Sequence, residues 1–224
     1  MAEGTELVIF DCDGVLVDSE RVSMDVSLSI AAEFGWDLTA DAFVELFVGS
    51  PGAAILKVIE GELGSDRAAR FLERFWPVFS AELERRLTPV EGIIETLDWI
   101  TSRTSMRICV ASNSGHDHIK GALSRTRLYD RFEGRVFSAH DVEHGKPAPD
   151  LFLHAAATLG IEPERCAVVE DSRAGVQAAR AAGMRSFGYG GGVTPGSWLE
   201  GVGTVVFSDM RHLPELLGDR RALS

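Results

Sequence analysis

The apolar positions of the chain follow two alternating patterns, short continuous runs and longer stretches with helical spacing. Continuous apolar runs bounded by polar residues are typical of strands buried on both faces, as in a parallel sheet covered by helices. Their alternation with helical segments predicts βαβ units with right-handed crossovers. The predicted strands are LVIF (7–10), MRICVA (106–111), RVFSA (135–139), CAVVE (166–170), RSFGYG (185–190) and TVVF (204–207). The helical segments between them are GIIETLDWITSR, GHDHIKGALSRT, APDLFLHAAATLG and SRAGVQAARAAG, and a last helix is expected near Leu213.

Residues 20–87 interrupt this alternation, because they contain no convincing strand pattern. Their apolar residues recur at the spacing of amphipathic helices. Thr88, Pro89 and Val90 mark the end of the stretch, since proline disfavours helix continuation. We therefore predict a helical domain inserted into the sheet domain. Its helical segments are VSMDVSLSIAAEF, ADAFVELF, AAILKVIEGEL and DRAARFLERFWPVFSAELERRL.

Composition and charge exclude several kinds of partner. The chain has 224 residues, of which 45% are hydrophobic, so it can bury a sizeable core. Its net charge of -12 argues against nucleic acid and anionic membranes, because those partners bind clustered Lys and Arg. No segment approaches the roughly 18 consecutive apolar residues of a membrane span, and the N-terminus MAEGTE lacks the features of a signal peptide. We therefore expect a cytoplasmic protein.

The cysteines and lysines are few. Three cysteines in or beside predicted strands, with no CxxC pair, are interpreted as buried reduced thiols. An anionic substrate would need local cations in so acidic a protein, and only three lysines are present. The cysteines are Cys12, Cys109 and Cys166, and the lysines are Lys57, Lys120 and Lys146.

Two aspartates directly follow the first predicted strand. Asp11 and Asp13 are two residues apart, so in an extended chain both point to the same side, roughly 6.5 Å apart. Gly14 then allows the chain to turn away. Two carboxylates that face one crevice repel each other unless a cation or a shared proton intervenes. The pair indicates a metal site, although an isolated Asp-x-Asp also occurs as solvated acids at a strand end.

Three further strand ends carry polar groups. Ser112 and Asn113 precede a glycine and a helix start, where backbone N–H groups suit an anion, although both types are also common helix caps. Lys146 lies between prolines in HGKPAPD and could supply a fixed positive charge. Glu170 and Asp171 end the strand CAVVE. Because open α/β sheets bind ligands outside the carboxyl ends of their strands, we expect these groups to share one site.

The four motifs DCDGVLVDSE, ASNSG, GKPAPD and VEDSRAG, in this order, closely resemble those of the haloacid dehalogenase superfamily. The position of the helical insertion resembles the subclass with an α-helical cap between the first two motifs, which includes phosphoglycolate phosphatases, sugar phosphatases and β-phosphoglucomutases. The resemblance implies an α/β fold, a Rossmann-like doubly wound parallel sheet with an inserted helical cap. It divides the chain into a catalytic core of residues 1–17 and 89–224 and a cap of residues 18–88.

The resemblance also implies catalytic roles. Asp11 would be the nucleophile that forms an aspartyl-phosphate, and Asp13 would be the general acid and then the general base. An essential Mg²⁺ would bind the Asp11 carboxylate, the Asp13 main-chain carbonyl and the Asp171 carboxylate. Whether Glu170 is a direct metal ligand is left open. The predicted reaction is hydrolysis of a small phosphate monoester, a sugar phosphate or phosphorylated sugar acid.

The phosphate-binding groups would be Ser112, the Asn113 backbone and Lys146, which hold the phosphoryl oxygens and offset developing charge. Lys146 is also expected to brace Asp11. We expect a monomer whose partner is a small phosphorylated metabolite. The cap residues expected to face the substrate are Glu20, Ser23, Gly49, Ser50 and Lys57.

Two alternatives stay open. β-Phosphoglucomutases carry a histidine and an arginine at positions that we align with Ser23 and Gly52, so a phosphosugar mutase is the less favoured reading. A non-catalytic phospho-acceptor module of the response-regulator type is more remote, because the strand RVFSA ends without an aspartate. The four histidines near the motifs are interpreted as surface or capping residues, since no Cys or acidic set completes a zinc site. They are His116, His118, His140 and His144.

Overall fold

The computed structural model describes residues 4–50 and 52–218. The chain divides into two compact units: Met1–Asp18 with Thr88–Ser224 form a core unit, and Ser19–Leu87 form a helical unit. The core unit is discontinuous in sequence because the helical unit is inserted after its first strand. The segments that flank the insertion pair with each other within the core unit, where the Asp18 amide donates to the Thr88 carbonyl.

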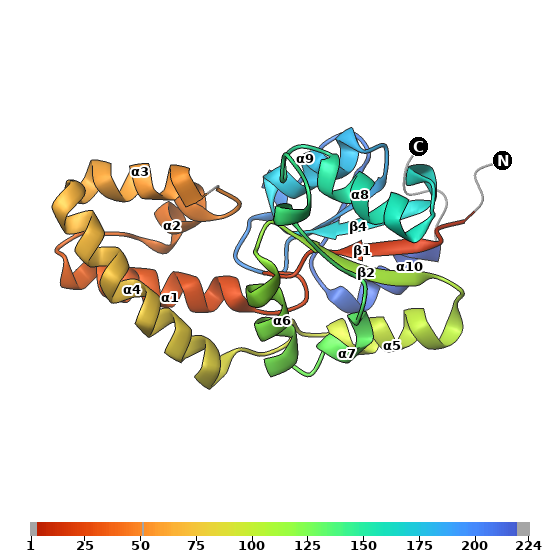
Figure 1. Cartoon of the computed structure of the whole chain (residues 1–224), viewed down its shortest axis with the longest axis horizontal. Coiled ribbons are helices and arrows are strands. Elements are labelled where there is room, and N and C mark those ends of the chain that lie inside the picture. Colours follow the sequence, from red (N-terminus) through yellow and green to blue (C-terminus); the bar gives the residue numbers. More distant parts are fainter. Residues whose placement is uncertain (1–3, 51, 219–224) are drawn as a thin grey trace. The chain divides into compact units, whose positions relative to one another are not determined.

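A parallel six-stranded sheet, in the order β3-β2-β1-β4-β5-β6, forms the centre of the core unit (Figure 1). The central strand β1 pairs with β2 on one side and with β4 on the other. The strand order therefore changes direction at β1, which is the place where open α/β sheets bind their ligands. The strands are β1 (Leu7–Phe10), β2 (Arg107–Ser112), β3 (Val136–Ser138), β4 (Cys166–Glu170), β5 (Arg185–Tyr189) and β6 (Thr204–Phe207).

Helices cover both faces of the sheet, which is why β1 is apolar at every position. Leu7 and Ile9 belong to a core cluster with residues of α8 and α9. On the other face, the Phe10 ring lies edge-to-face against Phe132 of α7, with 6.3 Å between centroids. The core-unit helices are α5 (Ile93–Arg103), α6 (His116–Arg125), α7 (Tyr129–Phe132), α8 (Asp150–Leu159), α9 (Arg173–Ala181) and α10 (Leu213–Gly218). Short 3-10 turns are η1 (Ala139–Asp141), η2 (Pro163–Arg165), η3 (Gly196–Trp198) and η4 (Met210–His212).

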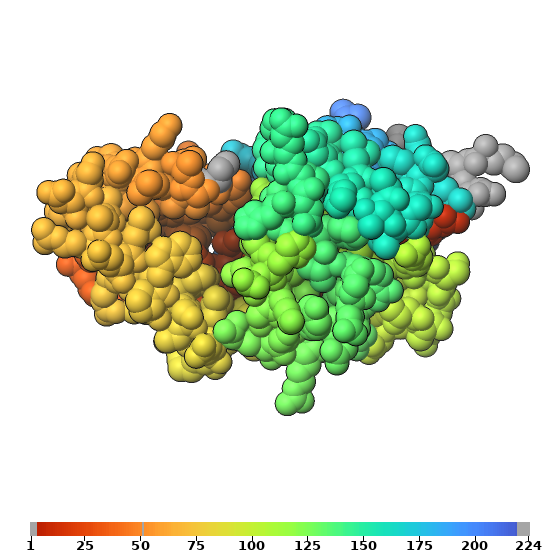
Figure 2. All heavy atoms as spheres, viewed as in Figure 1, coloured from red at the N-terminus to blue at the C-terminus, as the bar shows by residue number. Residues whose placement is uncertain are grey.

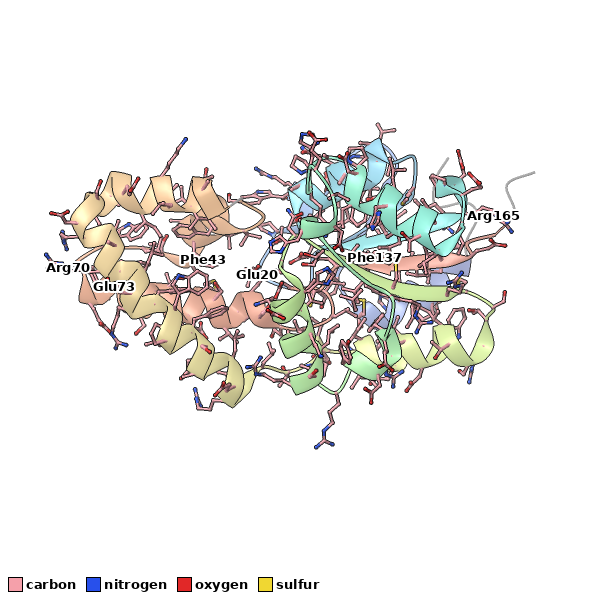
Figure 3. The ribbon with its side chains drawn as sticks, in the orientation of Figure 1. Glu20, Phe43, Arg70, Glu73, Phe137 and Arg165 are labelled. Carbon is pink, nitrogen blue, oxygen red and sulfur yellow. The ribbon has the colours of Figure 1, made fainter. Side chains whose placement is uncertain are left out.

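The helical unit is built from α1 (Ser19–Glu33), α2 (Ala40–Phe47), α3 (Gly52–Leu63) and α4 (Ser65–Arg86). Its apolar faces turn inward: Phe43 lies between the helices, whereas Arg70 and Glu73 point away from them (Figure 3). Ion pairs between α1 and α4 add to this packing, including Arg86 with Asp25 at 2.7 Å. In the view of Figure 2, atoms of α3 and α4 form much of the visible surface of this unit.

The predicted α/β fold with a doubly wound parallel sheet is confirmed. The element bounds differ from the predicted ones by a few residues. The first turn of α1, which begins at Ser19, was not predicted because it is polar and lies outside the apolar pattern. The short helix α7 was not predicted, since a single turn carries no periodicity. The three cysteines are buried free thiols, as expected. Within the described residues, no helix is long and apolar enough to cross a membrane.

Candidate active site

A buried ion-pair network lies at the carboxyl ends of β1 and β4. The Lys146 ammonium group donates to Asp11 Oδ1 and to Glu170 Oε1, at 2.5 Å in each case. The Lys146 and Glu170 side chains are 3% and 1% exposed. Because β1 and β4 are parallel neighbours, the residues at their ends meet at one edge of the sheet. Charges buried this deeply require partners, so the lysine and both acids depend on one another.

The loop that carries Lys146 is held by Asn113. The Asn113 Nδ2 group donates to the Lys146 carbonyl at 3.1 Å, and Asn113 Oδ1 accepts from the Lys146 amide at 2.9 Å. The peptide bond between Lys146 and Pro147 is cis, and Lys146 Nζ lies 4.9 Å from the centre of the Phe152 ring. The sequence predicted only a backbone role for Asn113. Its side chain has a further function, which is to position the lysine.

Glu170 uses both carboxylate oxygens within the protein. Oε1 accepts from Lys146, and Oε2 accepts from the amide and the hydroxyl of Ser172, at 3.0 and 2.8 Å. The Ser172 hydroxyl also accepts from the Gly175 amide and thereby caps α9. A Cβ at Gly175 would lie 1.8 Å from Glu170 Cδ, so only glycine leaves room for this carboxylate. These contacts favour a role for Glu170 in holding Lys146.

Asp13 is held by two residues at the start of α6. Ser114 Oγ donates to Asp13 Oδ2 at 2.9 Å, and His118 Nε2 lies 3.0 Å from Asp13 Oδ1. The interpretation of His118 as a surface or capping residue is therefore wrong, whereas His116 pairs with Asp141 at the surface. The signal that could have found His118 is its place in the first turn of a helix that begins directly after a strand end of the site.

The loop after β1 also meets Asp171. Gly14 has a φ of +82°, and a Cβ there would lie 2.0 Å from Asp171 Oδ2. The Asp171 carboxylate is therefore packed against the loop that carries Asp11 and Asp13. Ser112, 2% exposed, ends β2 beside β1, and its Oγ accepts from the Ser114 amide at 3.2 Å. All six sequence-predicted site residues thus lie on loops and strand ends at one edge of the sheet.

The electrostatics of the site are dominated by burial. The pKa of Asp11 is raised to about 8, mainly because burial disfavours its charge, while Lys146 lowers it and Glu170 and Asp13 raise it. Burial disfavours the charge of Lys146, but Asp11 and Glu170 outweigh this effect and raise the Lys146 pKa. The hydrogen bond and the charge of Asp13 raise the pKa of His118.

These groups fit a divalent cation. Asp11 and Glu170 pair with Lys146, and the Asp171 carboxylate lies against the Gly14 backbone, in the loop that also carries Asp13. No cluster of three or more His, Cys, Asp or Glu side chains that could hold a metal is found among residues 4–50 and 52–218. Mg²⁺ does not need such a cluster, because it commonly binds one or two carboxylates and completes its shell with water and substrate phosphate.

The doubly wound sheet, with an aspartate pair at its switch point, agrees with the family that the sequence motifs resemble. The sequence profile described as haloacid dehalogenase-like hydrolase matches residues 5–183. The chain belongs to this family, as the motifs indicated, and it is an enzyme of the phosphoric monoester hydrolase class.

Three similar proteins illustrate the relationship. A 6-phosphogluconate phosphatase of Escherichia coli is 31% identical over 182 residues, which cover 81% of each chain. The crystal structure of a conserved haloacid dehalogenase-like protein of unknown function from Agrobacterium tumefaciens has a TM-score of 0.84 and 35% identity, and the match covers 96% of this chain and 98% of that one. The crystal structure of a haloacid dehalogenase family hydrolase from Deinococcus radiodurans, with bound phosphate and sodium, has a TM-score of 0.82 and 30% identity, and the match covers 98% of both chains.

Proposed function

We propose that the chain is a Mg²⁺-dependent phosphatase that hydrolyses a small phosphate monoester, a sugar phosphate or phosphorylated sugar acid, through an aspartyl-phosphate. The observation that carries the proposal is the Asp11 carboxylate, which follows the central strand and accepts a hydrogen bond from the buried Lys146. One of its oxygens is thereby fixed, so the other has a defined direction. A fixed carboxylate beside a second aspartate provides both a nucleophile and a proton-transfer group.

In the first half-reaction, an Asp11 oxygen attacks the phosphorus atom and forms a new P–O bond. The ester P–O bond breaks, and the leaving oxygen takes its electron pair and receives a proton from Asp13. The products are an alcohol and phosphorylated Asp11. Asp13 is suited to this role because Ser114 and His118 orient its two carboxylate oxygens.

In the second half-reaction, a water molecule attacks the same phosphorus atom and gives a proton to the now ionised Asp13. The bond between phosphorus and Asp11 breaks, and its electron pair restores the carboxylate. Inorganic phosphate leaves, and Asp13 is protonated for the next cycle. Both half-reactions therefore use the same two aspartates in alternating roles.

The remaining groups bind the phosphoryl oxygens. Lys146 supplies a buried positive charge, the Ser112 hydroxyl can donate because its oxygen already accepts from the Ser114 amide, and the Asn113 backbone adds a donor. Mg²⁺, held by the Asp11 and Asp171 carboxylates and the Asp13 carbonyl, would supply charge that relieves repulsion between the nucleophile and the phosphate. The Deinococcus radiodurans relative has phosphate and sodium bound, which supports binding of an anion and a cation in this family.

The substrate class is supported by the names of relatives. The 6-phosphogluconate phosphatase of Escherichia coli acts, by its name, on a phosphorylated sugar acid, which agrees with the class predicted from the sequence. A small phosphorylated metabolite is therefore the proposed partner. The cytoplasmic location, the monomeric state and the substrate contacts of the helical unit stay predictions.

Release of inorganic phosphate from p-nitrophenyl phosphate tests the reaction. We expect turnover with Mg²⁺, loss of turnover after EDTA treatment, and recovery when Mg²⁺ is added back. The Asp11→Asn variant, purified in the same way, is the control for contaminating phosphatases. Turnover by this variant at the wild-type rate would refute the proposal. A panel of phosphorylated sugars and sugar acids, ranked by kcat/KM, then tests the substrate class.

A further inference from the structure

The helical unit contains a pocket that is lined by its own residues. Its cavity volume is about 340 Å³, and residues of all four helices line it. Ligand pockets commonly have volumes of roughly 300 to 1,000 Å³, and a smaller engineered apolar cavity of roughly 150 Å³ already binds benzene. The space is therefore sufficient for a molecule with one or two rings.

The lining of this pocket is aromatic. Its lining residues include Phe43, Phe71, Phe75, Trp76 and Phe79, and its aliphatic residues come from α3 and α4. Water is poorly held by such walls, because they offer few hydrogen-bonding groups. Rings bind well against other rings in edge-to-face or offset arrangements. The lining thus favours an aromatic ligand over a sugar or an ion.

The rings that form the walls are already packed against one another. Phe71 and Phe75 are stacked with 6.3 Å between centroids, and Phe75 and Phe79 are stacked with 5.2 Å. Phe43 and Phe47 form a tilted pair at 5.3 Å. Walls fixed in this way lose little further conformational freedom when a ligand binds, which favours affinity.

A buried hydroxyl adds a polar contact. Ser27 lines the pocket and is only 7% exposed, and within the described part of the chain its hydroxyl makes no hydrogen bond. A hydroxyl at the wall of an apolar pocket gains when a ligand supplies a hydrogen-bonding partner. Ser23, one helical turn earlier on α1, also lines the pocket. A ligand that carries a hydroxyl or similar group would satisfy Ser27 while its ring contacts the aromatic walls.

We infer that the helical unit binds a small aromatic molecule with one hydrogen-bonding group, of the phenol type, between its four helices. The inference does not rest on the proposed phosphatase mechanism. A helix of another protein is a poorer occupant, because the pocket has the volume of a small molecule.

Binding of phenol and of toluene to the full chain, measured by isothermal titration calorimetry, tests this inference. We expect both probes to bind the wild type. Ser27→Ala should weaken phenol binding by roughly two- to tenfold, the range of one hydrogen bond, and leave toluene binding unchanged. Ser29→Ala is the matched control, because Ser29 is an exposed serine on the same helix and does not line the pocket.

Two further measurements keep the test decisive. Ser23→Leu places an apolar side chain in the pocket and should abolish binding of both probes, whereas Ser29→Leu should not. In the wild type, the toluene methyl protons should show nuclear Overhauser effects to the rings of Trp76 and Phe79. Absence of binding, absence of these effects, or equal affinities for phenol in the Ser27→Ala and Ser29→Ala proteins would overturn the inference.

Discussion

The two units of this protein offer opposite kinds of contact to a ligand. The core unit collects carboxylates and a buried lysine at the ends of parallel strands, where each charge depends on its partners. The helical unit contains a pocket whose walls are rings and aliphatic chains, with Ser27 as a polar residue in the lining. Electrostatic contacts depend on the positions of single atoms, whereas apolar contacts depend mainly on shape and buried area.

Because of this difference, substitutions in the core site and in the helical pocket should have different consequences. A change of one atom in the core site should alter the reaction, because the polar groups there hold one another in position through hydrogen bonds. A change in the helical pocket alters which molecule fits, since its walls make many weak contacts. Variants of one region should therefore leave the other intact, and the following predictions test this separation.

The largest effect is expected for Asp11→Asn. An amide is a poor nucleophile, so phosphate release should fall by roughly a thousandfold or more. The fold should survive, because Asn has nearly the shape of Asp and Lys146 keeps its ion pair with Glu170. Initial rates and thermal unfolding measure the two effects. Phenol affinity should equal that of the wild type, and a weaker affinity would show that the two regions are coupled.

Asp13→Asn should reduce kcat by about 10²- to 10⁴-fold, the usual contribution of a general acid or base. The loss should be smaller for p-nitrophenyl phosphate than for an alkyl phosphate, because p-nitrophenolate needs little protonation to leave. Rapid-quench measurement of phosphorylated Asp11 separates the two half-reactions. An identical loss for both substrates would count against Asp13 as the acid.

Lys146→Met should lower stability as well as phosphate binding. Removal of the ammonium leaves Asp11 and Glu170 buried without their partner, which typically costs about 3 to 5 kcal/mol in the free energy of unfolding. Urea denaturation measures this loss. A second substitution, Glu170→Gln, should recover part of it because one of the two buried charges is removed. Unchanged stability in the single variant would show that the ion pairs contribute little.

The smallest effect is expected for His118, which positions Asp13. His118→Ala should lower kcat by roughly two- to tenfold with little change in KM, and His118→Gln should recover part of the loss because an amide N–H can also donate. Steady-state kinetics of both variants, compared with His116→Ala at the surface, measure the effect. A change in KM alone would argue against a role at Asp13.

The same contact predicts a pH dependence of stability. Because Asp13 raises the pKa of folded His118 above its unfolded value of about 6.5, the pair stabilises the protein fully below that value. The contribution is lost as pH rises through the folded pKa. The difference in unfolding free energy between wild type and His118→Ala should therefore shrink as the solution becomes more alkaline. A difference that grows with pH would contradict the sign.

Much of the fold could be predicted from the sequence because buried parallel strands are apolar at every position. The run Leu7–Phe10 matches β1 residue for residue, whereas the predicted strand 135–139 shrinks to Val136–Ser138 because its ends are not buried on both faces. The helix α7 was missed for lack of periodicity. The predicted site residues lie together because the carboxyl ends of parallel strands meet at one edge of the sheet.

By itself, the sequence determined the kind of fold and which strand ends carry chemistry, because both follow from the order of residues along single segments. Only the tertiary structure decided which groups touch. Lys146 bridges Asp11 and Glu170, and His118 contacts Asp13, across separations of 24 to 135 residues along the chain. Such contacts depend on strand order and on side-chain packing between segments, and no local pattern of residues records either.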